Sequence, residues 1–166
     1  MLWSEKVKKG NQWYFGYKGH IGVDKDTGLV NKLQTTAENV HDVTKVAELM
    51  EGTEEECYGD SGYLGVEKRE ETSQNNDQGQ PIRYIICERP SSLKKRYSGA
   101  DYDKALEAEH AKSSVRCKVE HVFAVVKGMF RFRKARWRGL TKLDAQLHML
   151  FALANLVLAA RPSRAV

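Results

Sequence analysis

At 166 residues, the chain is about as long as one domain and long enough to bury a core. Its 41% hydrophobic and 30% charged residues exclude a disordered chain, and its longest apolar run, residues 147–160, is shorter than the ~20 residues that span a bilayer. The net charge of +5 permits a nucleic-acid partner, while three widely spaced cysteines and the lack of an apolar leader favour a cytoplasmic protein without disulfides.

Hydrophobic periodicity and turn residues divide the sequence into alternating strands and helices. The expected strands are, in chain order, residues 14–24, 29–36, 56–58 and 82–87. The expected helices are residues 39–52, a polar segment after residue 63, part of residues 97–111, and residues 112–127 and 141–160. The first two strands flank a turn sequence and should form an antiparallel hairpin. Strands that alternate with helices after such a hairpin predict a mixed α/β sheet in one domain.

The helix expected over residues 112–127 carries charged side chains beside its apolar face. Its expected buried residues are Val115, Val119, Val122, Phe123 and Val126. At 100° per residue, Arg116, Glu120 and Lys127 fall within about 40° of one another at the border of that face. They could line a cleft, but a surface ion pair between Arg116 and Glu120 explains the same spacing, and the helix by itself favours the ion pair.

Asp60 is a second acidic candidate, because it stands between glycines directly after an expected strand. α/β folds bind ligands outside the carboxyl ends of their strands, although an ordinary turn also explains these residues. Asp60 and Glu120 together would suit magnesium, a hard cation that prefers carboxylate ligands. His41 and Asp42 could form a base and its orienting acid, but at the start of a helix capping is the more common role.

A basic stretch follows the charged helix. It contains seven basic and no acidic residues, namely Lys127, Arg131, Arg133, Lys134, Arg136, Arg138 and Lys142. Phe130, Phe132 and Trp137 are interleaved with these cations, and aromatic rings can stack on bases while cations meet phosphates. The stretch is therefore a candidate nucleic-acid surface, and a solvated basic loop is the alternative.

Several segments resemble the DDE transposases of bacterial insertion sequences, in the group named for insertion sequences four and five. They are residues 9–24, 36–42, 58–63, 116–123, 138–140 and 145–156. The resemblance implies a ribonuclease-H-like domain that cuts and joins DNA strands with divalent metal, Mg²⁺ or Mn²⁺. It places the family's second catalytic Asp at Asp60 and its catalytic Glu at Glu120. Arg116 and Lys127 complete the family's signature, in which Ser113 replaces the usual Tyr.

The resemblance also implies that part of the family's domain is absent. The family's first catalytic Asp lies on a central strand upstream of the segment that begins at Lys9, and no Asp precedes Lys9 in this sequence. We therefore expect residues 1–166 to form an incomplete ribonuclease-H-like α/β domain, a mixed sheet with flanking helices but without its first central strand. Such a chain would be a truncated transposase or one frame of a split gene, and inactive by itself.

Together, these interpretations predict a transposase fragment with Asp60 and Glu120 as catalytic metal ligands. The expected DNA-binding residues are Arg116, Lys127, Arg131, Arg133, Lys134, Arg136 and Arg138. The expected partners are DNA, the upstream half of a split transposase and further copies in the intact enzyme, at the nucleoid in the bacterial cytoplasm and not at a membrane. Two alternatives stay open: a non-catalytic DNA-binding or interaction fragment, and a ribonuclease-H-like nuclease that does not transpose.

Overall fold

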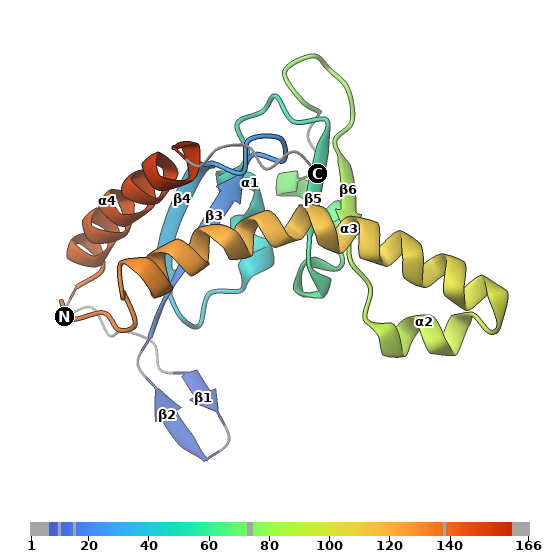
Figure 1. Ribbon diagram of the computed structural model, residues 1–166, viewed down its shortest axis with the longest axis horizontal. Helices are drawn as coiled ribbons and strands as arrows, with labels where there is room; N and C mark the ends of the chain where they lie inside the picture. The colour runs from blue at the N-terminus through green and yellow to red at the C-terminus, as the bar shows by residue number, and fades with distance from the viewer. Residues whose placement is uncertain (1–6, 10, 15, 73–74, 138, 161–166) are drawn as a thin grey trace. The chain divides into compact units, whose positions relative to one another are not determined.

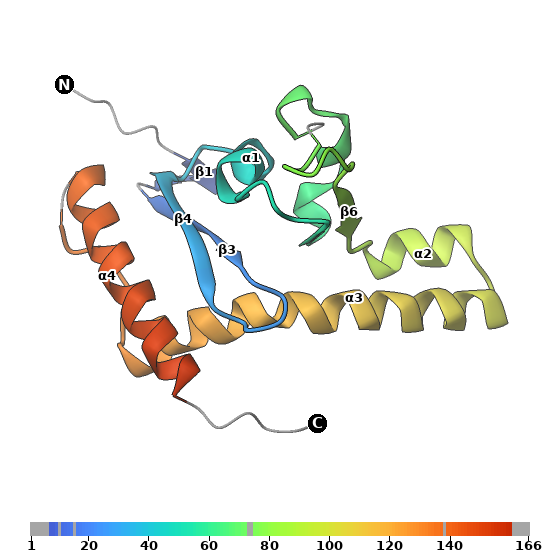
Figure 2. The same ribbon diagram turned by 90° about the horizontal axis from the view of Figure 1, so that it is seen from above.

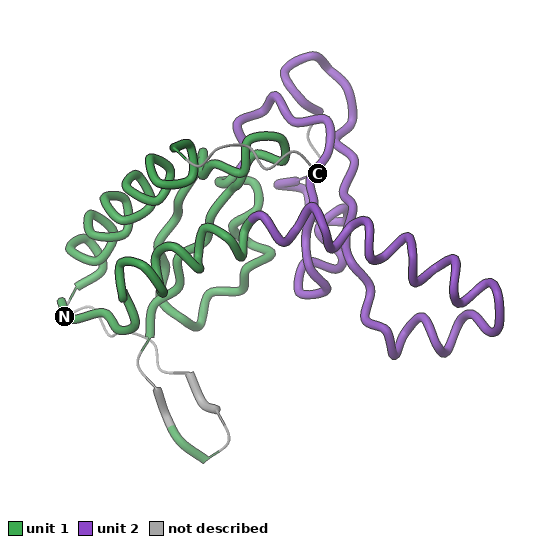
Figure 3. The backbone as a smooth tube through the Cα atoms, in the orientation of Figure 1, with its two compact units in different colours: residues 1–49, 119–166 green, residues 50–118 purple. Residues whose placement is uncertain are grey.

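The computed structural model describes residues 7–9, 11–14, 16–72, 75–137 and 139–160. These residues form both helices and strands, so the architecture is mixed α/β as predicted (Figure 1). The chain divides into two compact units (Figure 3). Unit 1 comprises residues 1–49 and 119–166, and unit 2 comprises residues 50–118. No helix formed by the described residues is long and apolar enough to cross a membrane.

The described strands form three two-stranded sheets, where the sequence predicts one mixed sheet. In unit 1, β3 (Tyr17–Val23) pairs antiparallel with β4 (Val30–Ala37), which confirms the predicted hairpin. The Asp24 carboxylate accepts hydrogen bonds from the N–H groups of Asp26 and Thr27 at 3.2 and 2.7 Å, and so stabilises the turn. An unpredicted hairpin of β1 (Val7–Lys9) and β2 (Gln12–Tyr14) precedes this pair.

The long helix α4 (Leu140–Ala159) packs on one face of the β3–β4 hairpin, as Figure 2 shows. The core of unit 1 consists of Val122, Val125, Val126, Leu143, Leu147, Leu150, Phe151 and Ala154. Tyr17, Ile21 and Val23 alternate along β3 and pack against this cluster. The last helix therefore packs on the sheet through one apolar face, with Leu158 partly buried at its end.

The side chain of Asn155 joins α4 to the sheet. Its Oδ1 accepts a hydrogen bond from the Val30 N–H, and its Nδ2 donates one to the Val30 carbonyl, both at 2.8 Å. One amide thus satisfies both backbone polar groups of a strand residue, as a neighbouring strand would. The polar residue that interrupts the apolar run in the sequence therefore fixes α4 against β4.

A 3₁₀ turn (Asp42–Lys45) continues into the single α-helical turn α1 (Val46–Leu49), which contacts both strands of the hairpin. This helix ends three residues before the predicted Gly52. The capping prediction is wrong, because the His41 side chain makes no capping hydrogen bond and Asp42 instead accepts one from Lys18. The His41 carbonyl accepts hydrogen bonds from Thr44 instead.

In unit 2, β5 (Glu56–Gly59) pairs in parallel with β6 (Arg83–Ile86), close to the predicted bounds. The polar helix predicted after β5 is absent, and three short 3₁₀ turns occupy its place (Ser61–Tyr63, Val66–Lys68 and Glu70–Thr72). Gly65 separates the first two turns with φ of +87°, a left-handed conformation that a continuous helix cannot include.

Helix α2 (Pro90–Arg96) begins at a proline, which fits the first helical position because the N–H there needs no intrahelical partner. Helix α3 (Ala100–Ala124) then runs for 25 residues and joins two segments that the sequence predicts as separate helices. No Gly or Pro interrupts these residues, so the helix has no reason to stop between them. It continues into a π-helical turn, η5 (Val125–Met129), which brings Val125 as well as Val126 into the core of unit 1.

Candidate functional site

Asp60 lies directly after the carboxyl end of β5, as predicted. Its backbone is extended and its side chain is exposed. Its Oδ1 accepts a hydrogen bond of 2.8 Å from the Gly62 N–H, so the carboxylate caps the short turn Ser61–Tyr63. The turn interpretation and the ligand interpretation of Asp60 are thus compatible, because one hydrogen bond fixes the carboxylate and leaves it accessible.

Two glycines explain how the backbone around Asp60 is held. A Cβ atom at Gly59 would lie 2.8 Å from Ile86 Cδ1 and 3.2 Å from Tyr63 Cβ, so only glycine lets β6 and the turn pack this closely. A Cβ atom at Gly62 would lie 3.0 Å from Asp60 Oδ1. The glycines on both sides of Asp60 therefore allow a close turn that presents its carboxylate at the strand end.

Cys87 directly follows β6, and the pKa of its thiol depends on charged groups of unit 2. Burial raises the pKa of its thiol, and the negative charges of Glu109 and Asp60 also raise it. Arg116 and Lys112 oppose this effect and lower the pKa. Asp60 and the half-buried Arg116 thus both act on the pKa of this thiol, with opposite effects.

Helix α3 is fixed to this end of β6 by Glu109. Its Oε2 accepts a hydrogen bond from the Glu88 N–H at 2.8 Å, and its Oε1 pairs with Lys112 Nζ at 2.6 Å. The Glu109 side chain is 12% exposed, so these contacts are largely sheltered from water. They set the position of α3 within unit 2, and with it that of Arg116.

Glu120 and Lys127 belong to unit 1, where both side chains are exposed. The Lys127 ammonium lies over the Phe123 ring at 4.9 Å from its centroid. Of the valines predicted to be buried, Val122 and Val126 are in the core, whereas Val115 and Val119 are only partly buried. Glu120 therefore stands on the exposed side of a helix whose neighbouring face packs into the core.

The loop between η5 and α4 presents most of the predicted basic stretch to solvent. Its exposed cations are Arg131, Arg133, Lys134 and Arg136, while Arg138 lies outside the described residues. Among the residues the structure describes, these four form no ion pair with a carboxylate. Arg131 has φ of +54°, and such strain in a residue other than glycine is concentrated at functional sites. The charge distribution of the loop matches that of a phosphate-binding surface.

The structure corrects the prediction for the aromatic residues of this loop. Phe130 and Phe132 pack against the hydrophobic core of unit 1, as does Ala135. Only Trp137 is largely exposed, at 58%. The two phenylalanines therefore anchor the loop and do not offer their rings to bases, whereas the cations beside them are exposed. Trp137 is the single aromatic side chain of the described loop that could stack on a base.

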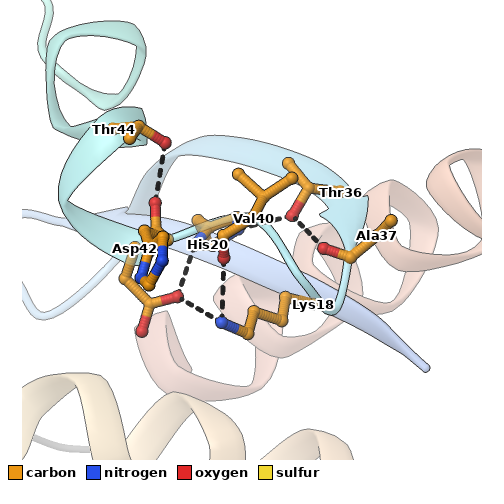
Figure 4. A network of polar contacts seen from close by, with 8 residues as sticks. Lys18, His20, Thr36, Ala37, Val40, Asp42 and Thr44 are labelled. Atoms are coloured by element: carbon orange, nitrogen blue, oxygen red, sulfur yellow. Dashed lines mark hydrogen bonds and ion pairs between the residues drawn. The ribbon is translucent and has the colours of Figure 1, made fainter. Parts of the chain in front are cut away.

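A polar network in unit 1 was not predicted (Figure 4). The His20 side chain is 3% exposed, and its Nε2 is hydrogen-bonded to Thr36 Oγ1 at 2.8 Å. Lys18 Nζ donates hydrogen bonds to the Val40 carbonyl and to Asp42 at 2.9 and 3.0 Å. Burial lowers the pKa of His20, and the negative charge of Asp42, 3.7 Å from Nδ1, partly offsets this. The network joins β3, β4 and the following turn, so its role is structural.

The described residues do not form a complete metal centre, because no three His, Cys, Asp or Glu side chains among them gather closely enough to hold an ion. The exposed Asp60 carboxylate offers the hard oxygen ligand that Mg²⁺ and Mn²⁺ prefer, and Glu120 has the same chemistry. The donor type therefore fits a divalent cation, and the number of carboxylates does not fill a two-metal site.

The family model described as the transposase DDE domain matches residues 2–156, which is most of the chain. No solved structure matches the chain.

Proposed function

Since the chain belongs to the transposase DDE domain family, we propose that it derives from a transposase catalytic domain that cuts and joins DNA strands at the ends of a mobile element. The observation that carries this proposal is the family match over residues 2–156, together with an exposed Asp60 at the carboxyl end of β5. Membership of the insertion sequence four and five group, a ribonuclease-H-like fold over residues 1–166 and a location at the bacterial nucleoid are parts of the same proposal.

Within this proposal, Asp60 and Glu120 are the carboxylates that hold a divalent cation, Mg²⁺ or Mn²⁺. When bound, such a cation supplies positive charge that stabilises the charge developing on the scissile phosphate. The hydrogen bond from Gly62 to Asp60 orients the first carboxylate before DNA binds. Arg116 and Lys127 contact DNA phosphates and offset the negative charge of the two acids. The reaction is in-line attack on a phosphodiester, first by water and then by a DNA 3′-hydroxyl.

We further propose that the third carboxylate comes from a strand outside this sequence. In the described part of the chain, β3 pairs only with β4 and β5 pairs only with β6, so both have an edge where another strand could add. An upstream strand with an Asp, from a longer chain or the other half of a split gene, would complete the site. The isolated chain then lacks activity, and it functions as a DNA-binding or interaction fragment, a second candidate that the exposed basic loop favours.

The test of the catalytic assignment uses the enzyme restored with its upstream part. Glu120→Gln is expected to abolish Mg²⁺-dependent strand cleavage and to leave DNA binding within about twofold, because the amide keeps the shape of the side chain but loses the ligand charge. Glu107→Gln, on the same helix and also exposed, is the matched control and should keep its activity. Retained cleavage in Glu120→Gln would leave Glu120 as a surface charge.

A companion assay uses the isolated chain and tests whether the third carboxylate is missing. Purified protein is expected to show no Mg²⁺-dependent nicking or joining of supercoiled plasmid. Nicking that disappears in Asp60→Asn would show that the described residues already contain a sufficient site. That result would favour the alternative of a complete ribonuclease-H-like nuclease.

The basic loop can be tested on the isolated chain by DNA binding at several salt concentrations. If about four cations meet phosphates, log K should fall with log salt at a slope of roughly −3 to −4. Arg133→Ala with Arg136→Ala should flatten the slope by about 2 and weaken binding to all DNA sequences alike. The control is Lys94→Ala with Lys95→Ala, which removes two exposed cations of α2 and should leave the slope unchanged. A slope near zero would show that this loop does not bind DNA phosphates, so the DNA contacts would have to lie elsewhere.

A further inference from the structure

The carboxyl ends of β5 and β6 lie side by side in unit 2. The two strands are parallel with Gly59 paired to Ile86, and the Cys87 N–H donates a hydrogen bond of 2.9 Å to the Gly59 carbonyl. The pairing therefore continues to the end of both strands. Asp60 directly follows β5, Arg89 lies three residues beyond β6, and both side chains are exposed. This edge of a parallel sheet is where α/β folds bind their ligands.

A hydrogen bond connects the Arg89 side chain to the turn that Asp60 caps. The Arg89 Nε donates to Ser61 Oγ at 3.2 Å, and Ser61 is the residue next to Asp60 in the chain. The backbone of Arg89 is extended, with φ of −73° and ψ of 139°, and the following Pro90 favours this conformation. Unit 2 by itself therefore holds the Arg89 guanidinium at the turn that presents the Asp60 carboxylate.

Arg89 differs from three other arginines of unit 2 in the partner that holds it. Arg69, Arg83 and Arg96 each pair with a glutamate side chain. In the described part of the chain Arg89 forms no ion pair, and Glu88, the acid next to it in sequence, pairs with Arg96 instead. The hydroxyl that holds Arg89 is neutral, so it positions the guanidinium without cancelling its charge. The two Nη groups have no partner among the residues that the structure describes.

We propose that Arg89 binds a DNA phosphate beside the turn of Asp60, and that Ser61 is its positioning residue. This inference rests on the proposed function, because it requires DNA to reach Asp60. The planar guanidinium presents its two Nη groups as a fork that matches two oxygens of a phosphate. The hydrogen bond from Nε to Ser61 leaves this fork unoccupied and restrains the side chain before DNA binds. Less side-chain freedom is then lost on binding.

The test is DNA binding by the full chain at several salt concentrations, with two variants that remove the same hydrogen bond. Arg89→Ala removes the bond and the charge, and it should flatten the slope of log K against log salt by about 1. Ser61→Ala removes the bond but keeps the charge, so it should keep the slope and weaken binding by about two- to tenfold. Lys94→Ala, which removes an exposed cation five residues away, is the matched control and should change neither quantity.

Arg89→Lys separates the charge from the fork. It should keep the slope and weaken binding, because an ammonium group has the charge but cannot bind two oxygens in the same way. If Arg89 only fastened the turn, Ser61→Ala and Arg89→Ala would change the slope equally, and that result would overturn the proposal. An unchanged slope in Arg89→Ala would overturn it and leave the proposed function in place, whereas a slope near zero in the unmodified chain would contradict both. Circular dichroism checks that each variant keeps its fold, and Arg89→Gln replaces Arg89→Ala if that variant does not.

Discussion

Unit 1 buries eight hydrophobic residues in one cluster, whereas the described residues of unit 2 bury Val66 and Leu93 together with the polar Thr72 and Asn76. In unit 2, side-chain hydrogen bonds to the backbone take a larger part, such as that from Tyr84 Oη to the Thr72 carbonyl at 2.8 Å. Hydrophobic stabilisation grows with buried apolar area, whereas each intramolecular hydrogen bond makes a net contribution to stability of only about 1 kcal/mol. Unit 1 is therefore expected to be the more stable part of the chain.

The largest expected effect on stability comes from creating a cavity in the core of each unit. Phe151→Ala should cost about 3–5 kcal/mol of unfolding free energy and Val66→Ala about 1–3 kcal/mol, because the phenylalanine ring fills more volume and lies within the larger cluster. Hydrogen exchange measured by mass spectrometry would follow the amides of each unit separately. Phe151→Ala should accelerate exchange throughout unit 1, and a change confined to α4 would show that the eight residues do not act as one core.

A second test compares two asparagines that bind the backbone. Asn155 joins residues 125 positions apart, whereas Asn76 accepts hydrogen bonds from Gln78 and Gln80 within its own loop. Asn155→Leu should cost about 2–3 kcal/mol, because the partly buried N–H and carbonyl of Val30 lose their partner. Asn76→Ala should cost about 1 kcal/mol and affect only its loop. Chemical denaturation would give the first value, and equal effects of the two variants would contradict the comparison.

Two glycines provide a smaller contrast. Gly59→Ala should cost about 1–3 kcal/mol, because the new Cβ would meet Ile86 and Tyr63 closely. Gly128→Ala in η5 has nothing within 4 Å of its Cβ and should be neutral or stabilising by up to about 1 kcal/mol. Thermal denaturation measures both. If Gly59→Ala left the melting temperature unchanged, the turn around Asp60 would be able to shift and make room for the new methyl group.

The smallest expected effect is the pH dependence from His20. Burial lowers the folded-state pKa of this imidazole below its ordinary value of 6.5, so the unfolded chain binds a proton first as the pH falls. The stability contributed by neutral His20 is therefore complete above pH 6.5 and is lost progressively as the pH drops toward the folded-state value. His20→Gln should flatten the pH dependence of the melting temperature between pH 7.5 and 5.5. If the pH dependence in His20→Gln were the same as in the unmodified chain, a group other than His20 would be responsible for it.

Much of the fold could be predicted from local patterns. The β3–β4 hairpin and the buried face of α4 follow from hydrophobic periodicities of two and about four residues. Such a periodicity can be recognised within one short segment of the sequence. The prediction of a polar helix after β5 was wrong because Gly65 adopts a left-handed conformation, which interrupts a helix. The composition of the segment does not reveal this conformation. The capping role of His41 and Asp42 was wrong: the His41 side chain makes no capping hydrogen bond, and Asp42 instead binds Lys18 of β3, a strand distant in sequence.

The candidate site shows the same division. The position of Asp60 after a strand and the run of cations from Lys127 could be read from neighbouring residues, as could the charges on the helix that contains Glu120. That Phe130 and Phe132 anchor the basic loop could not, because burial depends on the core they meet. The hydrogen bond from the Glu88 N–H to Glu109 could not be predicted either, because it joins the end of β6 to a helix 21 residues away in sequence, beyond any local periodicity.

The sequence by itself determined the β3–β4 hairpin, the strands β5 and β6, the two long helices, the apolar face of α4 and the places where charges gather, because these depend on spacing along the chain. Only the tertiary structure decided which partners those faces meet. It placed Asn155 on Val30 and enclosed His20 beside Thr36, and it left one side of α4 uncovered. Such contacts depend on closing long loops, where the packing of distant elements outweighs local preference.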